Sequence, residues 1–132
     1  MNSMKRILTL LLFTSLSSAH AQQWIPYSQT SQGTQYVDLQ RAVVMGGSTA
    51  FILDLHDMKF DTNDVEGNAY RSIVYAREFN CRKEQQRILS WQRKSESMGN
   101  GIIVSEYSQV SEWSDVKTPN AKRLMMAACE QR

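Results

Sequence analysis

The 132-residue sequence predicts one α+β domain: a single antiparallel β-sheet of five to six strands in a meander, with a C-terminal α-helix packed on it and tied by one disulfide. Three observations lead to this expectation. Segments of alternating apolar and polar residues recur between Tyr36 and Tyr107, helical spacing begins only after Pro119, and one of the two cysteines lies on each side of that change. The length suits one domain, and 42% hydrophobic with 21% charged residues is a globular composition.

The first 21 residues have the three parts of a secretory signal peptide. Lys5 and Arg6 precede an apolar run over 7–16, and Ala19 and Ala21 supply the small residues of a cleavage site. About 10 apolar residues fall short of the roughly 20 that cross a bilayer, so we expect a cleaved signal and no transmembrane segment. No cysteine lies near this site. We therefore expect an exported chain without a lipid anchor, located in the periplasm, at the cell surface or outside the cell.

Residues 22–35 are rich in Ser, Thr, Gln and Gly, and we expect an irregular leader there, followed by the folded domain over 36–132. Two short β-prone runs open that domain and end at the tight-turn signal Gly46-Gly47. The alternating segment 50–55 follows the turn. The pattern predicts a hairpin.

A polar run over 57–68 separates this hairpin from a second β-rich half. The longest strand candidate is 70–81, where arginines interrupt the apolar parity and indicate a bulge or an edge position. The remaining strand candidates are 87–93, 102–107, which follows the hairpin signal Asn100-Gly101, and the short segment 112–116.

The spacing of apolar residues changes after Pro119. Ala121, Leu124, Met125 and Ala128 recur at helical intervals, which predicts a short helix over 121–130 with Asn120 as its N-cap. A helix of about 10 residues is marginal alone, so we expect it to dock on the sheet.

The two cysteines, Cys81 and Cys129, both lie in the part expected to be exported. An oxidising compartment and an even count favour a disulfide between them, worth about 4 kcal/mol in the chain-entropy model. A redox pair or a metal site are the alternatives. Their wide separation lacks the CxxC spacing that lowers a thiol pKa, and therefore favours the structural bridge.

Catalytic patterns are not visible in the sequence. Removal of the signal leaves His56 as the single histidine, which excludes multi-histidine sites. The glycines form no phosphate-binding loop, and the acidic run does not have the spacing of a calcium loop. It consists of Asp54, Asp57, Asp61, Asp64 and Glu66. We therefore expect a protein that is not an enzyme, with no catalytic residue, metal or cofactor.

Charge is distributed in blocks. Cleavage would remove two of the 15 basic residues and none of the 13 acidic ones, which leaves a neutral chain with an acidic run followed by a basic segment. Such a segment with interleaved aromatics suits an acidic polymer, an anionic lipid surface or a negatively charged protein loop, and export argues against nucleic acid. A solvated surface paired with the acidic run is the alternative. The candidate binding face comprises Arg71, Arg77, Arg87, Trp91, Arg93 and Lys94.

The order of these features resembles the bacterial surface-adhesin protein E family over nearly the whole expected mature chain. The matching features are Trp24, Tyr36-Val37-Asp38, Leu53 to Leu55 around Asp54, Tyr70-Arg71-Ser72, Phe79-Asn80-Cys81, Arg87, Met98-Gly99-Asn100-Gly101, Trp113-Ser114-Asp115-Val116 and Cys129. The resemblance implies an adhesin E-like sheet-plus-helix domain over 36–132 that binds host matrix or serum glycoproteins and can form a homodimer.

Two functional hypotheses follow. The first is an exported, non-enzymatic binding module that contacts host matrix or envelope glycoproteins through the basic face. The second is a periplasmic structural or assembly component of the bacterial envelope with no adhesive role.

Overall fold

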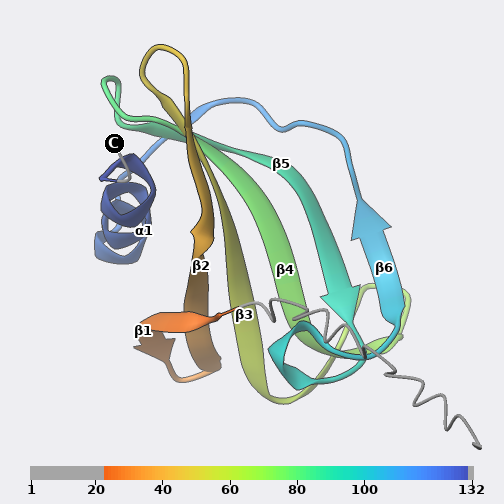
Figure 1. Ribbon diagram of the computed structural model, residues 1–132. Coiled ribbons are helices and arrows are strands. Elements are labelled where there is room, and N and C mark those ends of the chain that lie inside the picture. The colour runs from red at the N-terminus through yellow and green to blue at the C-terminus, as the bar shows by residue number, and fades with distance from the viewer. Residues whose placement is uncertain (1–22, 131–132) are drawn as a thin grey trace, which may run out of the picture.

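The computed structural model describes residues 23–130 and contains one antiparallel sheet in the strand order β1-β2-β3-β4-β5-β6, with β7 paired to β5 (Figure 1). The sheet, its meander order and the single helix confirm the predicted fold. The expected signal peptide over 1–21 lies outside the described residues. The elements are β1 (Ile25–Thr30), β2 (Gly33–Met45), β3 (Thr49–Asn63), β4 (Ala69–Asn80), β5 (Gln85–Lys94), the 3₁₀ turn η1 (Ser97–Gly99), β6 (Ile103–Tyr107), β7 (Ser114–Asp115) and α1 (Pro119–Cys129).

The expectation of an irregular leader over 22–35 is wrong for residues 23–35, which the structure describes. Strand β1 pairs with β2 there, from Ile25 opposite Val37 to Thr30 opposite Gly33. Because β1 is an edge strand, most of its side chains face water, and its polar composition hides it from an apolar alternation pattern. Tyr27 is the residue of β1 that packs against the core.

The polar run over 57–68 was expected to separate two β-rich halves, but strand β3 continues to Asn63 and the turn over 64–68 joins it to β4. Within the run, the register against β4 shifts between Asp57 and Thr62. Strand β4 pairs with β3 on one side and β5 on the other, so it occupies an interior position. The irregularity that its arginines indicated is a register shift between Ala76 and Arg77, opposite an additional residue of β5.

Helix α1 begins at Pro119, two residues earlier than predicted. Thr118, and not Asn120, is its N-cap, because the Thr118 hydroxyl accepts from the backbone N–H of Ala121 at 3.1 Å and Pro119 occupies the first helical position. The helix packs Leu124, Met125 and Ala128 against a core of sheet residues that includes Val37, Ala50, Ile52 and Phe79. The disulfide between Cys81 and Cys129 is present and joins the end of β4 to the last residue of α1.

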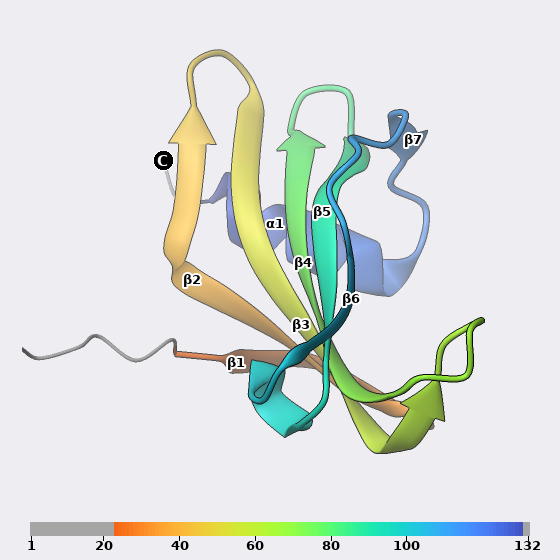
Figure 2. The same cartoon turned by 90° about the vertical axis from the view of Figure 1, so that its right-hand side faces the viewer.

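Helix α1 covers only part of one sheet face. Figures 1 and 2 show it beside the end of the sheet that carries the β2–β3 turn, while β1 crosses the opposite end. Along β3, Ala50 and Ile52 lie in the core beneath α1, and the alternate residues Asp54 and His56 project from the same face further along. This continuation of the helix-side face beyond α1 is where chemically distinctive side chains gather.

Candidate functional site

Beyond α1, the helix-side face carries two adjacent rows of side chains that cross the strands. Residues directly opposite each other in an antiparallel ladder project from the same face, so the pairing register defines each row. The first row, from β2 to β6, consists of Val37, Asp54, Tyr75, Trp91 and Tyr107. The second row consists of Gln35, His56, Ile73, Arg93 and Ser105.

Asp54 and Arg77 form a buried ion pair at the centre of this region. The Arg77 Nε donates to Asp54 Oδ1 at 2.7 Å, with the Asp54 side chain fully buried and the Arg77 side chain 14% exposed. Burial alone would lower the pKa of Arg77, but the charge of Asp54 and the hydrogen bond between them outweigh it and raise the pKa. The guanidinium also lies over Tyr75, 4.5 Å from the ring centroid. The charge of Arg77 is therefore compensated inside the protein, and its role is to position its neighbours.

Two tyrosines beside this pair are held in their neutral form. Burial raises the pKa of Tyr27, and the negative charge of Asp54 raises it further. Burial also raises the pKa of Tyr75, although the nearby charge of Arg77 opposes the shift. The His56 ring lies 4.8 Å from the Tyr75 ring, and its Nε2 is 3.3 Å from Asp54 Oδ2. The Asp54–Arg77 pair therefore has polar and aromatic surroundings, and the charges of its two members balance each other.

Arg93 lies against two aromatic rings. Its Cζ is 4.3 Å from the ring centroid of Trp91 and 5.1 Å from that of Tyr70, and its Nη1 donates to the Ser105 hydroxyl at 3.3 Å. Trp91 stacks on Tyr107 with centroids 5.9 Å apart and an interplanar angle of 20°. Tyr107 is exposed, whereas Trp91 and Arg93 are half-buried. We call Tyr70, Trp91, Arg93 and Tyr107 the aromatic–arginine patch. Its rings hold a planar cation in a defined position.

The charge of Arg93 is not compensated by an adjacent carboxylate. Among residues 23–130, Arg71, Arg77 and Arg87 each lie within 4.0 Å of a carboxylate oxygen, but the ion pairs of this region do not include Arg93. The pKa of Asp64 is lowered, chiefly by the backbone N–H of Asn68 and to a smaller extent by the charge of Arg93.

The six residues of the predicted binding face do not share one side of the sheet. Arg77, Trp91 and Arg93 lie on the helix-side face. Arg87 projects from the opposite face, where it donates to Glu78 at 2.8 and 2.9 Å and covers the ring of Trp113. Lys94 pairs with Ser72 across the ladder and also belongs to the opposite face.

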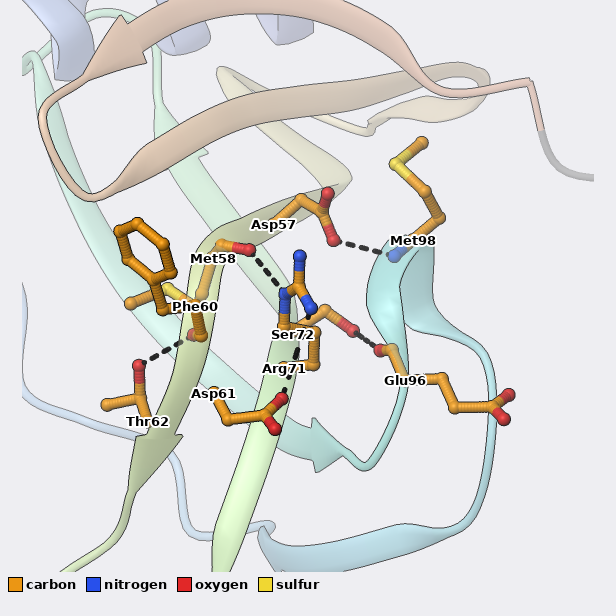
Figure 3. Close-up of polar contacts among 9 residues, drawn as sticks. All are labelled: Asp57, Met58, Phe60, Asp61, Thr62, Arg71, Ser72, Glu96 and Met98. Carbon is orange, nitrogen blue, oxygen red and sulfur yellow. Dashed lines mark hydrogen bonds and ion pairs between the residues drawn. The ribbon is translucent and has the colours of Figure 1, made fainter.

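Arg71 has a local structural role. Its Nε donates to the carbonyl oxygen of Met58 at 2.7 Å, and its Nη1 lies 4.0 Å from Asp61 Oδ1 (Figure 3). Met58 and Asp61 belong to a segment of β3 where the register against β4 shifts between Asp57 and Thr62. Arg71 thus fixes the irregular part of this strand.

The face predicted from the sequence did not include Tyr70 or Tyr107. Tyr107 and Trp91 are adjacent only through the β5–β6 register, and the sequence does not specify a register. The alternation of side chains along a strand could have separated these residues, because it places Trp91 and Arg93 on one face of β5 and Lys94 on the other.

Within residues 23–130, the helix-side face shows neither a metal-binding cluster nor a nucleophile beside its histidine. Among residues 23–130, no group of three or more His, Cys, Asp or Glu side chains is placed to hold a metal ion. His56 contacts Gln35 and Asp54 but no serine or cysteine nucleophile within the described chain. A planar cation beside aromatic rings is suited to carboxylates and other anionic groups on a partner.

The chain matches a protein-family model and is similar to several solved structures. The family model described as surface-adhesin protein E matches residues 24–130. No curated protein matches the chain.

Solved structures that are similar to this chain include those of Haemophilus influenzae protein E. Its selenomethionine form has a TM-score of 0.62 at 12% identity, covering 80% of this chain and 86% of that one. Crystal form II has a TM-score of 0.61 at 14% identity, covering 73% and 80%. A further structure has a TM-score of 0.60 at 15% identity, covering 81% and 87%. At these identities the likeness establishes the fold.

Helix length gives one further finding. Between residues 23 and 130 the structure has no helix that is long and apolar enough to cross a membrane.

Proposed function

The chain belongs to the surface-adhesin protein E family, and from this premise we propose that it is an exported, non-enzymatic binding module that contacts an acidic protein or glycoprotein surface through the aromatic–arginine patch. Within that proposal the partner is a host matrix or envelope glycoprotein. The observation that carries it is the state of Arg93, whose guanidinium is held by Trp91 and Tyr70 while its charge has no carboxylate partner among the described residues.

Positioning by aromatic rings lowers the cost of binding. A free arginine side chain loses rotamer freedom when a partner immobilises it, but Arg93 is already constrained by two rings and by Ser105. Tryptophan, tyrosine and arginine are also the residue types that contribute most to binding energy at protein interfaces. Tyr107 supplies exposed aromatic area at the rim of the same patch.

Adjacent residues of β5 provide a matched test. Arg93→Gln and Lys94→Gln each remove one positive charge at neighbouring positions, but the two side chains project from opposite faces. With purified fibronectin as the probe, we expect Arg93→Gln to weaken binding about tenfold and to reduce its salt dependence. Lys94→Gln should leave the affinity within about twofold of the parent. Equal effects of the two variants would contradict the assignment of the contact to this face.

Location on the cell separates the proposal from its alternative. If the protein is displayed, protease added to intact cells should digest it. A protected periplasmic pool, together with no affinity for fibronectin, would favour a structural or assembly component of the envelope.

We propose in addition that the chain forms a homodimer through β6. This strand ends the sheet, and in the described chain no strand pairs with its outer edge. Antiparallel pairing of two copies along this edge would bring their β6 strands together, and the side chains of Ile103 and Tyr107 on this strand are exposed in the single chain. Sedimentation should detect a dimer that Ile103→Lys dissociates. A monomeric parent protein at about 100 μM would contradict this pairing.

A further inference from the structure

Two adjoining cavities lie against the β1–β2 turn. The inner cavity, of about 330 Å³, is lined by the turn and by Gln35, His56 and Tyr75. The outer cavity, of about 340 Å³, is lined by Met58, Phe60 and Thr62. Both include Ser31, Gln32, Met58 and Tyr70 in their walls, so they form one groove with two lobes. Each lobe has the size of a small-ligand site.

The outer lobe displays an aromatic ring to solvent. Phe60 is 76% exposed, which is unusual for a phenylalanine within a strand. Its position follows from the register shift in β3, where Arg71 binds the Met58 carbonyl oxygen and the Thr62 hydroxyl donates to the carbonyl oxygen of Phe60 at 3.2 Å (Figure 3). Irregularities of this kind redirect side chains next to binding sites.

A hydrogen bond ties the two walls of the groove together. The backbone N–H of Lys59 donates to the carbonyl oxygen of Gln32 at 2.8 Å, which links the irregular segment of β3 to the β1–β2 turn. Gly33, which ends the turn, lies so close to β3 that an added Cβ would overlap the carbonyl oxygen of Asp57. The backbone thus fixes the β1–β2 turn against β3 at this groove.

Gln35, in the wall of the inner lobe, has a buried side-chain oxygen without a partner. The side-chain oxygen of Gln35 is buried and accepts no hydrogen bond, while its nitrogen lies 3.3 Å from His56 Nε2. Exchanging the oxygen and nitrogen of the amide leaves one of its polar atoms without a protein partner in either orientation. A buried amide group left unpaired costs free energy, which a ligand hydroxyl would recover because it both donates and accepts.

From these features we propose that the groove binds a short saccharide segment, with one pyranose ring against Phe60 and the next unit hydrogen-bonded to Gln35 in the inner lobe. The C–H groups of a pyranose face are partly positive and suit the negative face of an aromatic ring. Its hydroxyls suit the amide. An apolar peptide side chain would use Phe60 but would leave the Gln35 amide unpaired, so the polar inner lobe favours a saccharide over a peptide.

The groove shares Tyr70 with the aromatic–arginine patch, but Arg93 does not line it, so its test separates it from the proposed function. The protein lacking the signal segment is labelled with ¹⁵N and titrated with lactose, cellobiose, maltose and N,N′-diacetylchitobiose. We expect at least one of them to shift the signals of Phe60 and the Gln35 side-chain amide, with a dissociation constant of about 1 to 10 mM.

Phe60→Ala should weaken this binding at least about tenfold without loss of the fold, because the ring is exposed. Ile102→Ala is the matched control, since Ile102 is 73% exposed outside the groove, and it should have no effect. Arg93→Gln should also leave saccharide binding unchanged. No shift with any of the four sugars at about 100 mM, or shifts that map elsewhere, would overturn the proposal. Loss of fibronectin binding in Phe60→Ala without a response to sugars would identify a peptide site in its place.

Discussion

Replacing both cysteines with serine should destabilise the protein by about 4 kcal/mol. The disulfide joins residues separated by 48 positions, and closing a loop of that length removes roughly 14 cal/mol/K from the entropy of the denatured chain, or about 4 kcal/mol at about 25 °C. Because a small domain has a net stability of about 5 to 15 kcal/mol, the loss is a large fraction of the total. The bond also holds the last residue of an 11-residue helix that would be marginal alone.

Equilibrium unfolding in urea measures this difference directly. The double variant Cys81→Ser/Cys129→Ser should unfold at a lower urea concentration, and its denaturant slope should rise because its denatured chain is less compact. Adding a reductant should lower the stability of the parent to that of the variant and leave the variant unchanged. A loss smaller than about 1 kcal/mol would refute the reasoning, since the loop would then not constrain the denatured state.

Three further changes test the buried polar groups and the helix cap. Asp54→Asn should cost about 3 to 5 kcal/mol in urea unfolding because it leaves Arg77 buried without its partner, and adding Arg77→Met should recover part of the loss; no recovery would contradict this reason. Raising the pH above about 10 should lower the free energy of unfolding, because the pKa of Tyr27 is raised in the fold. The stabilisation is complete below the pKa of an unfolded tyrosine and is lost progressively as the pH rises toward the raised pKa. Tyr27→Phe should reduce this loss, and an unchanged pH profile would argue against it. Thr118→Ala should cost about 1 kcal/mol by removing the acceptor for Ala121, while Thr118→Ser should retain most of the stability.

Much of the fold was accessible from the sequence because apolar periodicity and turn residues act locally. The alternation over 50–55 and the change of spacing after Pro119 located the central hairpin and the helix. Strand β1 was missed because a solvent-facing edge strand with polar side chains has no apolar period. The helix cap was placed two residues late because Thr118 and Asn120 are both good caps, and only the geometry of Pro119 separates them.

The candidate site was less accessible, because it depends on register. The sequence grouped arginines by proximity along the chain, yet Arg87 and Lys94 project away from Arg93 once β5 pairs with β4. It also could not assign Arg77 to a buried ion pair, since the register that brings Asp54 near depends on long-range pairing. Phe60 is exposed because of a local irregularity in β3, and an isolated phenylalanine in a polar run does not indicate one.

The most direct test of the central claim uses two tryptophans as reporters of opposite sheet faces. Trp91 belongs to the aromatic–arginine patch, and Trp113 lies under Arg87 on the other face. During addition of substoichiometric fibronectin to ¹⁵N-labelled protein, the indole N–H signal of Trp91 should broaden and shift while that of Trp113 stays unchanged. Broadening of Trp113 with an unaffected Trp91 would contradict binding through the helix-side face.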